Sequence, residues 1–225
     1  MKIAVITGGT DGIGKAMVTD LLKDEYQVFT IGRNVAKLKD ISDHNLISFQ
    51  GDLTDKKSLE EFCAFVNSKS EKIDLLINNA GIQIGNNPLL NFSENDLLTM
   101  IQVHVVAPLK LLQAFHPRLK LSDNPIIINI VSNVVTNYLK ETYGLYTISK
   151  FAEYGLGQMM QKELTKDNFK ITNVILGGVE TNIRNSLRPE YLKPLEVALA
   201  INYLIKSLTK VYIPEICIFP KINVA

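Results

Sequence analysis

The sequence contains no tryptophan, only two cysteines and almost no excess charge of either sign. Cys63 and Cys217 lie far apart without metal-ligand spacing, so we expect buried thiols, with neither a disulfide nor a metal site. Lysine and arginine total 24 against 23 aspartate and glutamate residues, a formal net charge of +1. This balance, with no long block of like charge, gives no reason to expect a nucleic acid or an anionic membrane as partner.

Long hydrophobic runs are also missing, although 46% of the residues are hydrophobic. No apolar run approaches the roughly 18 residues needed to span a bilayer, and no charged-then-apolar leader precedes the first apolar segment. We therefore expect a cytoplasmic protein without a membrane partner. A chain of 225 residues can bury one large core and is long for two independent ones, so we expect a single domain over residues 1–225.

Seven short apolar segments alternate with six longer segments of helical character. The expected strands are 2–7, 27–32, 46–50, 73–78, 125–132, 170–176 and 215–219. The expected helices are 12–24, 35–41, 55–68, 94–119, 146–165 and 194–208. Nearly continuous Val, Ile and Leu is typical of buried parallel strands, so we predict an α/β fold, Rossmann-like and doubly wound, with a seven-stranded parallel sheet between two helical layers. Ligands of such sheets bind beyond the carboxyl ends of the strands.

The first expected strand leads directly into a glycine-rich turn, which a helix-favouring stretch follows. Gly8 permits a sharp exit from the strand, Gly12 lets the backbone approach a pyrophosphate, and Gly14 lets the helix pack on the sheet. The unpaired amides of the helix N-terminus face the anion. Glycines alone are more often turn residues, but this strand-turn-helix context predicts a dinucleotide site. The turn residues assigned to the cofactor are Gly8, Thr10, Asp11, Gly12, Ile13 and Gly14.

The spacing Gly-x-x-x-Gly-x-Gly behind Thr7 resembles the nucleotide loop of the short-chain dehydrogenases/reductases. Three further landmarks fall in that family's order, and the resemblance extends from residue 2 to about residue 220. They are Asn78-Asn79-Ala80-Gly81 after an apolar strand, Ser132 at the end of another, and the pair Tyr146 and Lys150. The resemblance implies an NAD(P)-dependent oxidoreductase that acts on a carbonyl or an alcohol. It also implies that Asn79, Ala80 and Gly81 border the cofactor.

The end of the second expected strand bears on the choice of cofactor. NAD sites usually have an acidic side chain there for the adenosine ribose, whereas NADP sites have a cation for the added phosphate. Here Gly32 stands in the acidic position and Arg33 follows, able to form a forked contact with a phosphate. We therefore expect NADP, with NAD possible, although a solvated arginine is the alternative. Asp52 and Leu53 resemble the family's adenine-contacting pair, and for Asp52 a helix N-cap is the alternative.

Tyr146 and Lys150 are four residues apart, which places both on one face of a helix. A phenol is a poor proton relay at neutral pH, and a nearby ammonium group makes it usable by favouring the phenolate. A half-buried aromatic beside a solvated charge is the alternative. The resemblance implies that Tyr146 donates the proton, that Lys150 also holds the nicotinamide ribose, and that Ser132 orients the carbonyl and steadies the oxyanion. A serine at this strand end could otherwise be a simple cap.

Two positions depart from the family's pattern. His104 stands where the family commonly has an asparagine, in a kinked helix whose main-chain carbonyl holds a water of the proton relay. A histidine there can donate one hydrogen bond, and it can make the proton relay depend on pH, since its ordinary pKa is about 6.5. A core histidine whose ring nitrogens are simply hydrogen-bonded is the alternative. Gly177 replaces a proline, which should loosen the turn. In that turn the amide of Val179 and the side chain of Thr181 are implied to bind the nicotinamide carboxamide.

We interpret the chain as an NADP-dependent carbonyl reductase or alcohol dehydrogenase with a small-molecule substrate. A 3-oxoacyl-thioester reductase, and a sensor that binds NADP without turnover, are the alternatives. The substrate pocket is expected around Gln83, Asn133, Tyr138, Tyr143 and the segment 182–193.

A homodimer or homotetramer is also expected, because apolar residues surround much of the helix 146–165, more than one buried stripe requires. These residues are Phe151, Tyr154, Leu156, Met159 and Met160. Members of the family commonly pair through this helix and the helix 94–119.

Overall fold

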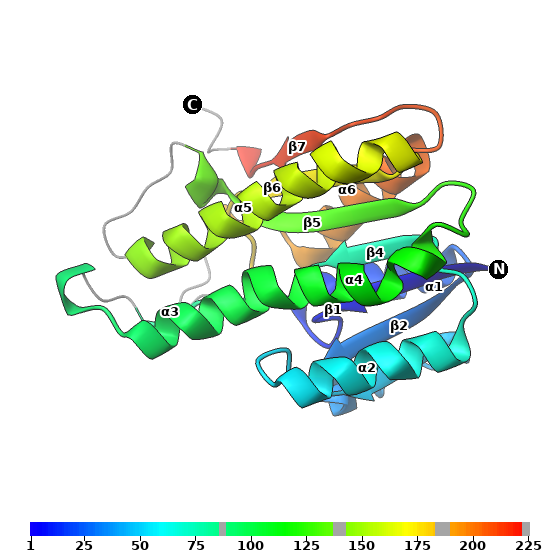
Figure 1. Ribbon diagram of the computed structural model, residues 1–225, viewed down its shortest axis with the longest axis horizontal. Helices are drawn as coiled ribbons and strands as arrows, with labels where there is room; N and C mark the ends of the chain where they lie inside the picture. Colours follow the sequence, from blue (N-terminus) through cyan, green and yellow to red (C-terminus); the bar gives the residue numbers. More distant parts are fainter. Residues whose placement is uncertain (86–88, 137–142, 183–189, 222–225) are drawn as a thin grey trace.

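The computed structural model describes residues 1–85, 89–136, 143–182 and 190–221, which form one parallel sheet between two helical layers (Figure 1). The strand order is β3-β2-β1-β4-β5-β6-β7, and every pairing is parallel. The strands are β1 (Lys2–Thr7), β2 (Tyr26–Gly32), β3 (Leu46–Gln50), β4 (Leu75–Asn78), β5 (Ile126–Ser132), β6 (Lys170–Leu176) and β7 (Glu215–Ile218). The α-helices are α1 (Gly12–Lys23), α2 (Lys56–Lys69), α3 (Glu94–Ile101), α4 (Ala107–Leu119), α5 (Gly144–Leu164) and α6 (Pro194–Ser207). The predicted doubly wound fold is confirmed.

Each helical layer buries its own apolar core against the sheet. Helices α2, α4 and α5 lie in front of the sheet in Figure 1, and α1 and α6 lie behind it. The front core contains Phe62 and Phe115, and the rear core contains Leu21 and Ile201. Because both faces of the central strands are covered, most of their side chains are apolar. The strand order reverses between β1 and β4, and this reversal creates the crevice in which such sheets bind ligands.

The segment 35–41 is not the helix expected from the sequence. Only a single 3-10 turn forms there, over Val35–Leu38, and Leu38 is its one buried residue. A helix this short cannot be stabilised by packing when it offers one apolar side chain to the core. The connection between β2 and β3 therefore stays an exposed loop.

The predicted helix 94–119 is continuous but changes its geometry in the middle. A π-helical turn, η3 (Gln102–Val106), joins α3 to α4. Pro108 has no backbone N–H to donate to the carbonyl of His104 four residues earlier, so regular α-helical bonding is interrupted at this point. Insertions of this kind often occur at functional sites.

By length and composition alone, the helical stretch Glu94–Leu119 could cross a membrane, since its mean hydropathy is 1.4. Among the described residues, one helix meets this criterion. No continuous apolar run marks this stretch in the sequence, because charged and polar residues interrupt it. Met100, Val103, Leu111 and Phe115 of this helix are buried within the molecule. The absence of a membrane partner remains a prediction.

Both cysteines are free, and only one of them is buried. Cys63 on α2 is buried, as expected. Cys217 is exposed, so the expectation of two buried thiols is wrong for this residue. It belongs to β7, the edge strand, along which exposed and half-buried residues alternate.

Candidate active site

Hydrogen bonds join the carboxyl ends of β1 and β4 at the crevice. The Thr7 hydroxyl oxygen accepts hydrogen bonds from the backbone amides of Asn79 and Ala80, each at 3.0 Å. The Asn79 side-chain amide donates to the carbonyls of Thr7 at 2.8 Å and Gly8 at 3.4 Å. These bonds attach the Asn79–Gly81 segment to the glycine-rich turn, although neither is near the other in the sequence.

The glycine-rich turn requires glycine for two separate reasons. Gly8 and Gly12 have φ angles of +68° and +50°, in the left-handed region that other residues avoid. A Cβ atom on Gly14 would lie 2.2 Å from the Gly8 carbonyl oxygen, so only glycine lets α1 begin this close to the strand. A Cβ on Gly12 would lie 3.3 Å from the methyl group of Thr181. The structure thus brings the predicted loop after β6 next to the predicted phosphate cradle.

Charged side chains surround the N-terminus of α1 near the end of β2. The Asp11 carboxylate accepts from the Gly12 amide at 2.8 Å and from the Asn182 side chain at 2.8 Å, and it forms an ion pair with Lys37. Burial alone would raise the pKa of Asp11, but the hydrogen bonds from Lys37, Asn182 and Gly12 lower it below the ordinary value. Lys15 pairs with Asp40 at 2.7 Å. The pairing of Lys37 could not be predicted from the sequence, because it depends on how the loop after β2 folds back.

Arg33, the expected phosphate ligand, is exposed immediately after β2. Its neighbour Gly32 lies against Thr10 of the glycine-rich turn, since a Cβ on Gly32 would be 2.4 Å from the Thr10 methyl group. The arginine therefore adjoins the turn that is predicted to hold the pyrophosphate.

Asp52 is not a helix N-cap, so that alternative is wrong. Its Oδ1 atom accepts from the backbone and the hydroxyl of Thr54, both at 2.9 Å. Asp55 caps α2 instead, accepting from the amides of Lys57 at 3.0 Å and Ser58 at 3.4 Å. Leu53 is buried in the front core. Adenine contacts by Asp52 and Leu53 stay a prediction.

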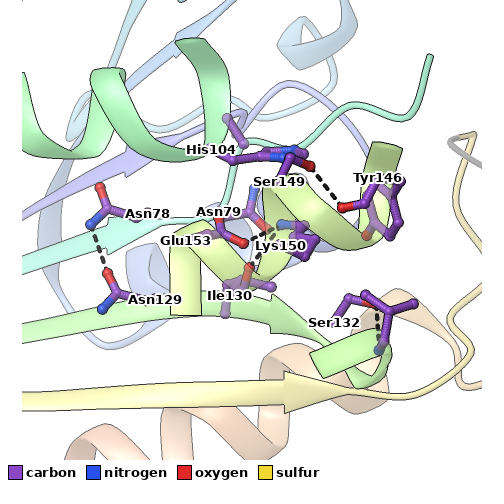
Figure 2. Close-up of polar contacts among 12 residues, drawn as sticks. Asn78, Asn79, His104, Asn129, Ile130, Ser132, Tyr146, Ser149, Lys150 and Glu153 are labelled. Carbon is purple, nitrogen blue, oxygen red and sulfur yellow. Dashed lines mark hydrogen bonds and ion pairs between the residues drawn. The ribbon is translucent and has the colours of Figure 1, made fainter. Parts of the chain in front are cut away.

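Helix α5 places Tyr146 and Lys150 on one face at the carboxyl edge of the sheet (Figure 2). The Lys150 ammonium lies 5.9 Å from the centre of the Tyr146 ring. It donates to Glu153 Oε2 at 2.6 Å and to the Ile130 carbonyl at 3.4 Å. The lysine is buried, so the alternative of a solvated charge is wrong. A buried ammonium beside a phenol favours the phenolate and so supports proton transfer.

The His104 side chain is fully buried in the π-helical turn, with both ring nitrogens bonded. Nε2 accepts from the Ile82 amide at 3.1 Å, which leaves Nδ1 to donate to the Ser149 hydroxyl at 2.9 Å. That hydroxyl donates to the Tyr146 carbonyl at 2.7 Å. Burial, with a smaller contribution from Lys150, holds the pKa of His104 well below its usual value. Its ring is therefore neutral at physiological pH, and the added pH dependence expected near an ordinary histidine pKa is wrong.

The neutral state of His104 predicts a stability change in acid. The unfolded chain binds a proton at this residue below about pH 6.5, whereas the folded chain does not, so stability is present above that pH and falls below it. Between pH 7.5 and 5.5 we expect the wild type to lose about 1 kcal/mol more unfolding free energy than His104→Asn, measured with urea. His44→Asn is the control, since that side chain is 92% exposed. Equal losses in wild type and His104→Asn would contradict the prediction.

Ser132 is the last residue of β5, and its hydroxyl accepts from the Val134 amide at 3.4 Å. The hydroxyl therefore does cap the end of the strand, as the alternative expected. Figure 2 shows Ser132 at the same end of the site as Tyr146. Orientation of a substrate carbonyl by this hydroxyl stays a prediction.

The turn after β6 is well bonded, so the expectation that Gly177 loosens it is wrong. The Gly177 amide donates to the Ile218 carbonyl at 2.9 Å, a bond that a proline could not make. A Cβ on Gly177 would lie 2.7 Å from the Phe219 ring, so the position has no room for a side chain. Val179 then pairs with Leu192 in an isolated bridge, which holds the segment before Thr181.

Three buried asparagines, which no spacing in the sequence marks as a set, support α5. Asn78, Asn129 and Asn173 lie side by side on β4, β5 and β6 and are joined by hydrogen bonds of 2.8 and 3.1 Å. Gly157 of α5 lies so close that a Cβ would be 2.1 Å from Asn173 Oδ1. The register of the strands, which is not visible in the sequence, creates this ladder.

Several expected pocket residues lie outside the described part of the chain. Tyr138 and residues 183–189, which include the middle of the segment 182–193, fall in this category. Tyr143 is described, with its ring centre 6.4 Å from that of Tyr146. Gln83 and Asn133 lie in the described loops after β4 and β5.

The fold and the site define a dinucleotide-dependent oxidoreductase. A family model for the short chain dehydrogenases matches residues 2–192, and the chain belongs to this family of NAD(P)-dependent enzymes.

Relatives and solved structures agree with this assignment. An uncharacterized oxidoreductase of Staphylococcus aureus is 29% identical over 97% of each chain, and one of Staphylococcus epidermidis is 28% identical over the same shares. An alcohol dehydrogenase from the archaeon Thermococcus sibiricus, complexed with 5-hydroxy-NADP, has a TM-score of 0.89 at 27% identity, covering 100% of this chain and 99% of that one. A 3-ketoacyl-(acyl-carrier-protein) reductase from Brucella melitensis, complexed with NADH, has a TM-score of 0.89 at 18% identity, with 99% and 98% covered, and shows likeness of fold alone.

Proposed function

We propose that the protein is an NADP-dependent oxidoreductase that interconverts a carbonyl and a secondary alcohol, with Tyr146 as general acid and base. The observation that carries this proposal is the buried Lys150 ammonium, which lies 5.9 Å from the Tyr146 ring centre and beside Gly81 of the segment after β4. The cofactor, when bound, supplies or accepts the hydride. Tyr146 gives its proton to the carbonyl oxygen in reduction and removes it in oxidation.

The residues present suit a bound dinucleotide. Left-handed backbone at Gly8 and Gly12, followed by the amides that open α1, makes an anion cradle of the kind that holds a pyrophosphate. Thr181 adjoins Gly12, which supports contact between Thr181 and the nicotinamide carboxamide, with the Val179 amide beside it. Asn79 to Gly81 line the same crevice. Ser132 orients the substrate carbonyl and stabilises charge on its oxygen.

NADP is the preferred cofactor in this proposal, and NAD fits the same cradle. The exposed cation Arg33 follows β2, and Lys37 neutralises the Asp11 carboxylate that would otherwise oppose a second phosphate. The complex of the Thermococcus sibiricus enzyme with 5-hydroxy-NADP supports this preference. His104 supports proton transfer through its hydrogen bonds and not through a charge. Its bonds to Ile82 and Ser149 attach the crevice loop to the helix of Tyr146.

The test is an assay of a panel of substrates with NADPH and with NADH, in which the absorbance of the reduced nicotinamide measures how much cofactor is consumed. The panel contains ketones, aldehydes and a 3-oxoacyl thioester, so that the thioester-reductase alternative is examined together with the others. Consumption of NADPH with at least one carbonyl compound is expected. Tight NADPH binding without turnover on any compound would favour the non-catalytic alternative.

We further propose a homodimer or homotetramer in the cytoplasm, with no nucleic acid or membrane partner. The described helices α3, α4 and α5 expose large apolar side chains, whereas Met160, which was expected at the interface, is buried. The exposed ones are Leu98, Leu109, Ile148, Phe151 and Met159. Water-exposed apolar area of this extent favours burial against a second copy.

Sedimentation equilibrium at micromolar concentration should therefore give a mass of at least twice 25.1 kDa. Replacing Phe151 with glutamate should lower this mass, because an unpaired charge in an apolar interface costs several kcal/mol. Glutamate at exposed Lys162 of the same helix is the control. A wild-type monomer would contradict the prediction.

A further inference from the structure

Glu153 is a buried carboxylate one turn after Lys150, and none of the sequence landmarks includes it. The side chains of Lys150 and Glu153 are only 5% and 4% exposed, and their charged atoms are 2.6 Å apart. Removing two charges from water is costly, and apolar residues of similar size often serve stability equally well. A buried ion pair at a catalytic lysine therefore calls for a role beyond stability.

The contacts of Lys150 show what Glu153 contributes. An ammonium group has three N–H donors, of which one is directed to Glu153 and a second to the Ile130 carbonyl of β5. These two bonds hold the nitrogen between α5 and the sheet, as Figure 2 shows. The third donor remains for the groups at the carboxyl edge, where Tyr146 lies. Without the carboxylate, the ammonium would be held by the weaker carbonyl contact alone.

We propose that Glu153 is a positioning residue of the proton-transfer group, which holds the Lys150 ammonium in place and, by its negative charge, sets how strongly that ammonium acts on the Tyr146 hydroxyl. The inference rests on the proposed function, since it concerns the same tyrosine and lysine. An ammonium group acts on a neighbouring phenol, and a carboxylate next to that ammonium opposes this effect. The charge of Glu153 therefore limits the influence of Lys150 on the Tyr146 hydroxyl.

The surroundings of the pair support this role. Burial raises the pKa of Glu153 to about 7, although Lys150 acts to lower it. Burial would lower the pKa of Lys150, but Glu153 and Tyr146 raise it above the usual value. His104, from the π-helical turn, is neutral. The carboxylate and the ammonium are therefore strongly coupled, with their charged atoms 2.6 Å apart.

The other elements packed on α5 bring few charges to this place. Strands β4, β5 and β6 present the uncharged asparagine ladder, and the described 3-10 turn Asn133–Val135 after β5 contains no titratable residue. Helix α3 has Glu94 and Asp96 in its first turn, of which Glu94 is exposed. Lys170 begins β6, and Lys166 and Asp167 follow α5, all at the opposite edge of the sheet from Tyr146. Among the described residues, Lys150 is the charge that acts on Glu153.

The decisive experiment compares pH–rate profiles of wild type, Glu153→Gln and Glu163→Gln in both reaction directions, with the carbonyl compound and NADPH found in the substrate panel. Glutamine keeps an oxygen acceptor for the ammonium but removes the charge. In Glu153→Gln we expect the limb of the pH–rate profile, the pH range over which the rate changes, to move to lower pH by on the order of half to one pH unit. Glu163 is exposed on the same helix, so Glu163→Gln should retain the wild-type profile.

A second variant covers the case in which Glu153→Gln does not fold. Glu153→Asp keeps the charge but is one methylene shorter, which breaks the 2.6 Å contact, so its limb should move in the same direction by a smaller amount. A limb that stays in place, with activity reduced equally at every pH, would overturn the inference and leave Glu153 a structural residue. A wild type without turnover would instead contradict the proposed function.

Discussion

Replacing Tyr146 with phenylalanine should lower turnover by about 10²- to 10⁴-fold while cofactor binding stays nearly unchanged, because the hydroxyl supplies the proton of the reaction. The ring itself has separate contacts, with the rings of His104 and Tyr143 at centre distances of 6.0 and 6.4 Å. Phenylalanine can keep these contacts, so the helix and the crevice should persist. Single-turnover reduction and a fluorescence titration with NADPH measure the two effects separately.

Tyr154→Phe is a matched control for this experiment. Tyr154 lies on the same helix, but its hydroxyl donates to Glu215 Oε2 at 2.7 Å on the exposed side next to β7. Loss of this hydroxyl should leave turnover close to that of the wild type. Activity of Tyr146→Phe within tenfold of wild type would show that the proton comes from another group.

Replacing Arg33 with alanine should raise the KM for NADPH roughly 10- to 150-fold and change the KM for NADH little. This range corresponds to about 1.5 to 3 kcal/mol for a hydrogen bond to a charged group. The contact exists only with the 2′-phosphate, which NADH lacks. Because Arg33 is exposed after β2, solvent screening favours the lower end of the range.

Lys57→Ala is the control for the loss of one positive charge. Lys57 is exposed on α2 and faces Glu61 at 3.7 Å. It should leave both KM values unchanged. Equal increases for NADPH and NADH in Arg33→Ala would place the phosphate at another cation, with Lys37 the next to test because it already neutralises Asp11.

The fold was largely predictable because its central strands are buried on both faces. Continuous Val, Ile and Leu marks such strands wherever they occur, and all seven were located within two residues at each end. The errors arose where local pattern and packing disagree. Residues 35–41 have helical character but only Leu38 to bury, and Pro108 changes the hydrogen bonding within a helix that otherwise reads as continuous.

The sequence by itself determined the features that depend on neighbours along the chain. Two glycines with positive φ and a helix beginning at Gly12 follow from the order of residues in one turn. The common face of Tyr146 and Lys150 follows from four-residue spacing on a helix. Such relations are set by covalent geometry and helical periodicity, so they can be recognised without knowing what packs nearby.

Only the tertiary structure decided the partners that come from distant segments. Whether Lys150 is solvated or buried depends on how closely α5 approaches β5, which also determines the bond to Ile130. Glu153 lies one turn away in the sequence, yet its pairing matters because both charges are removed from water. The neutral state of His104 likewise follows from complete burial and from the Ile82 amide. Desolvation and strand register are properties of the packed molecule, and no spacing within a single segment contains them.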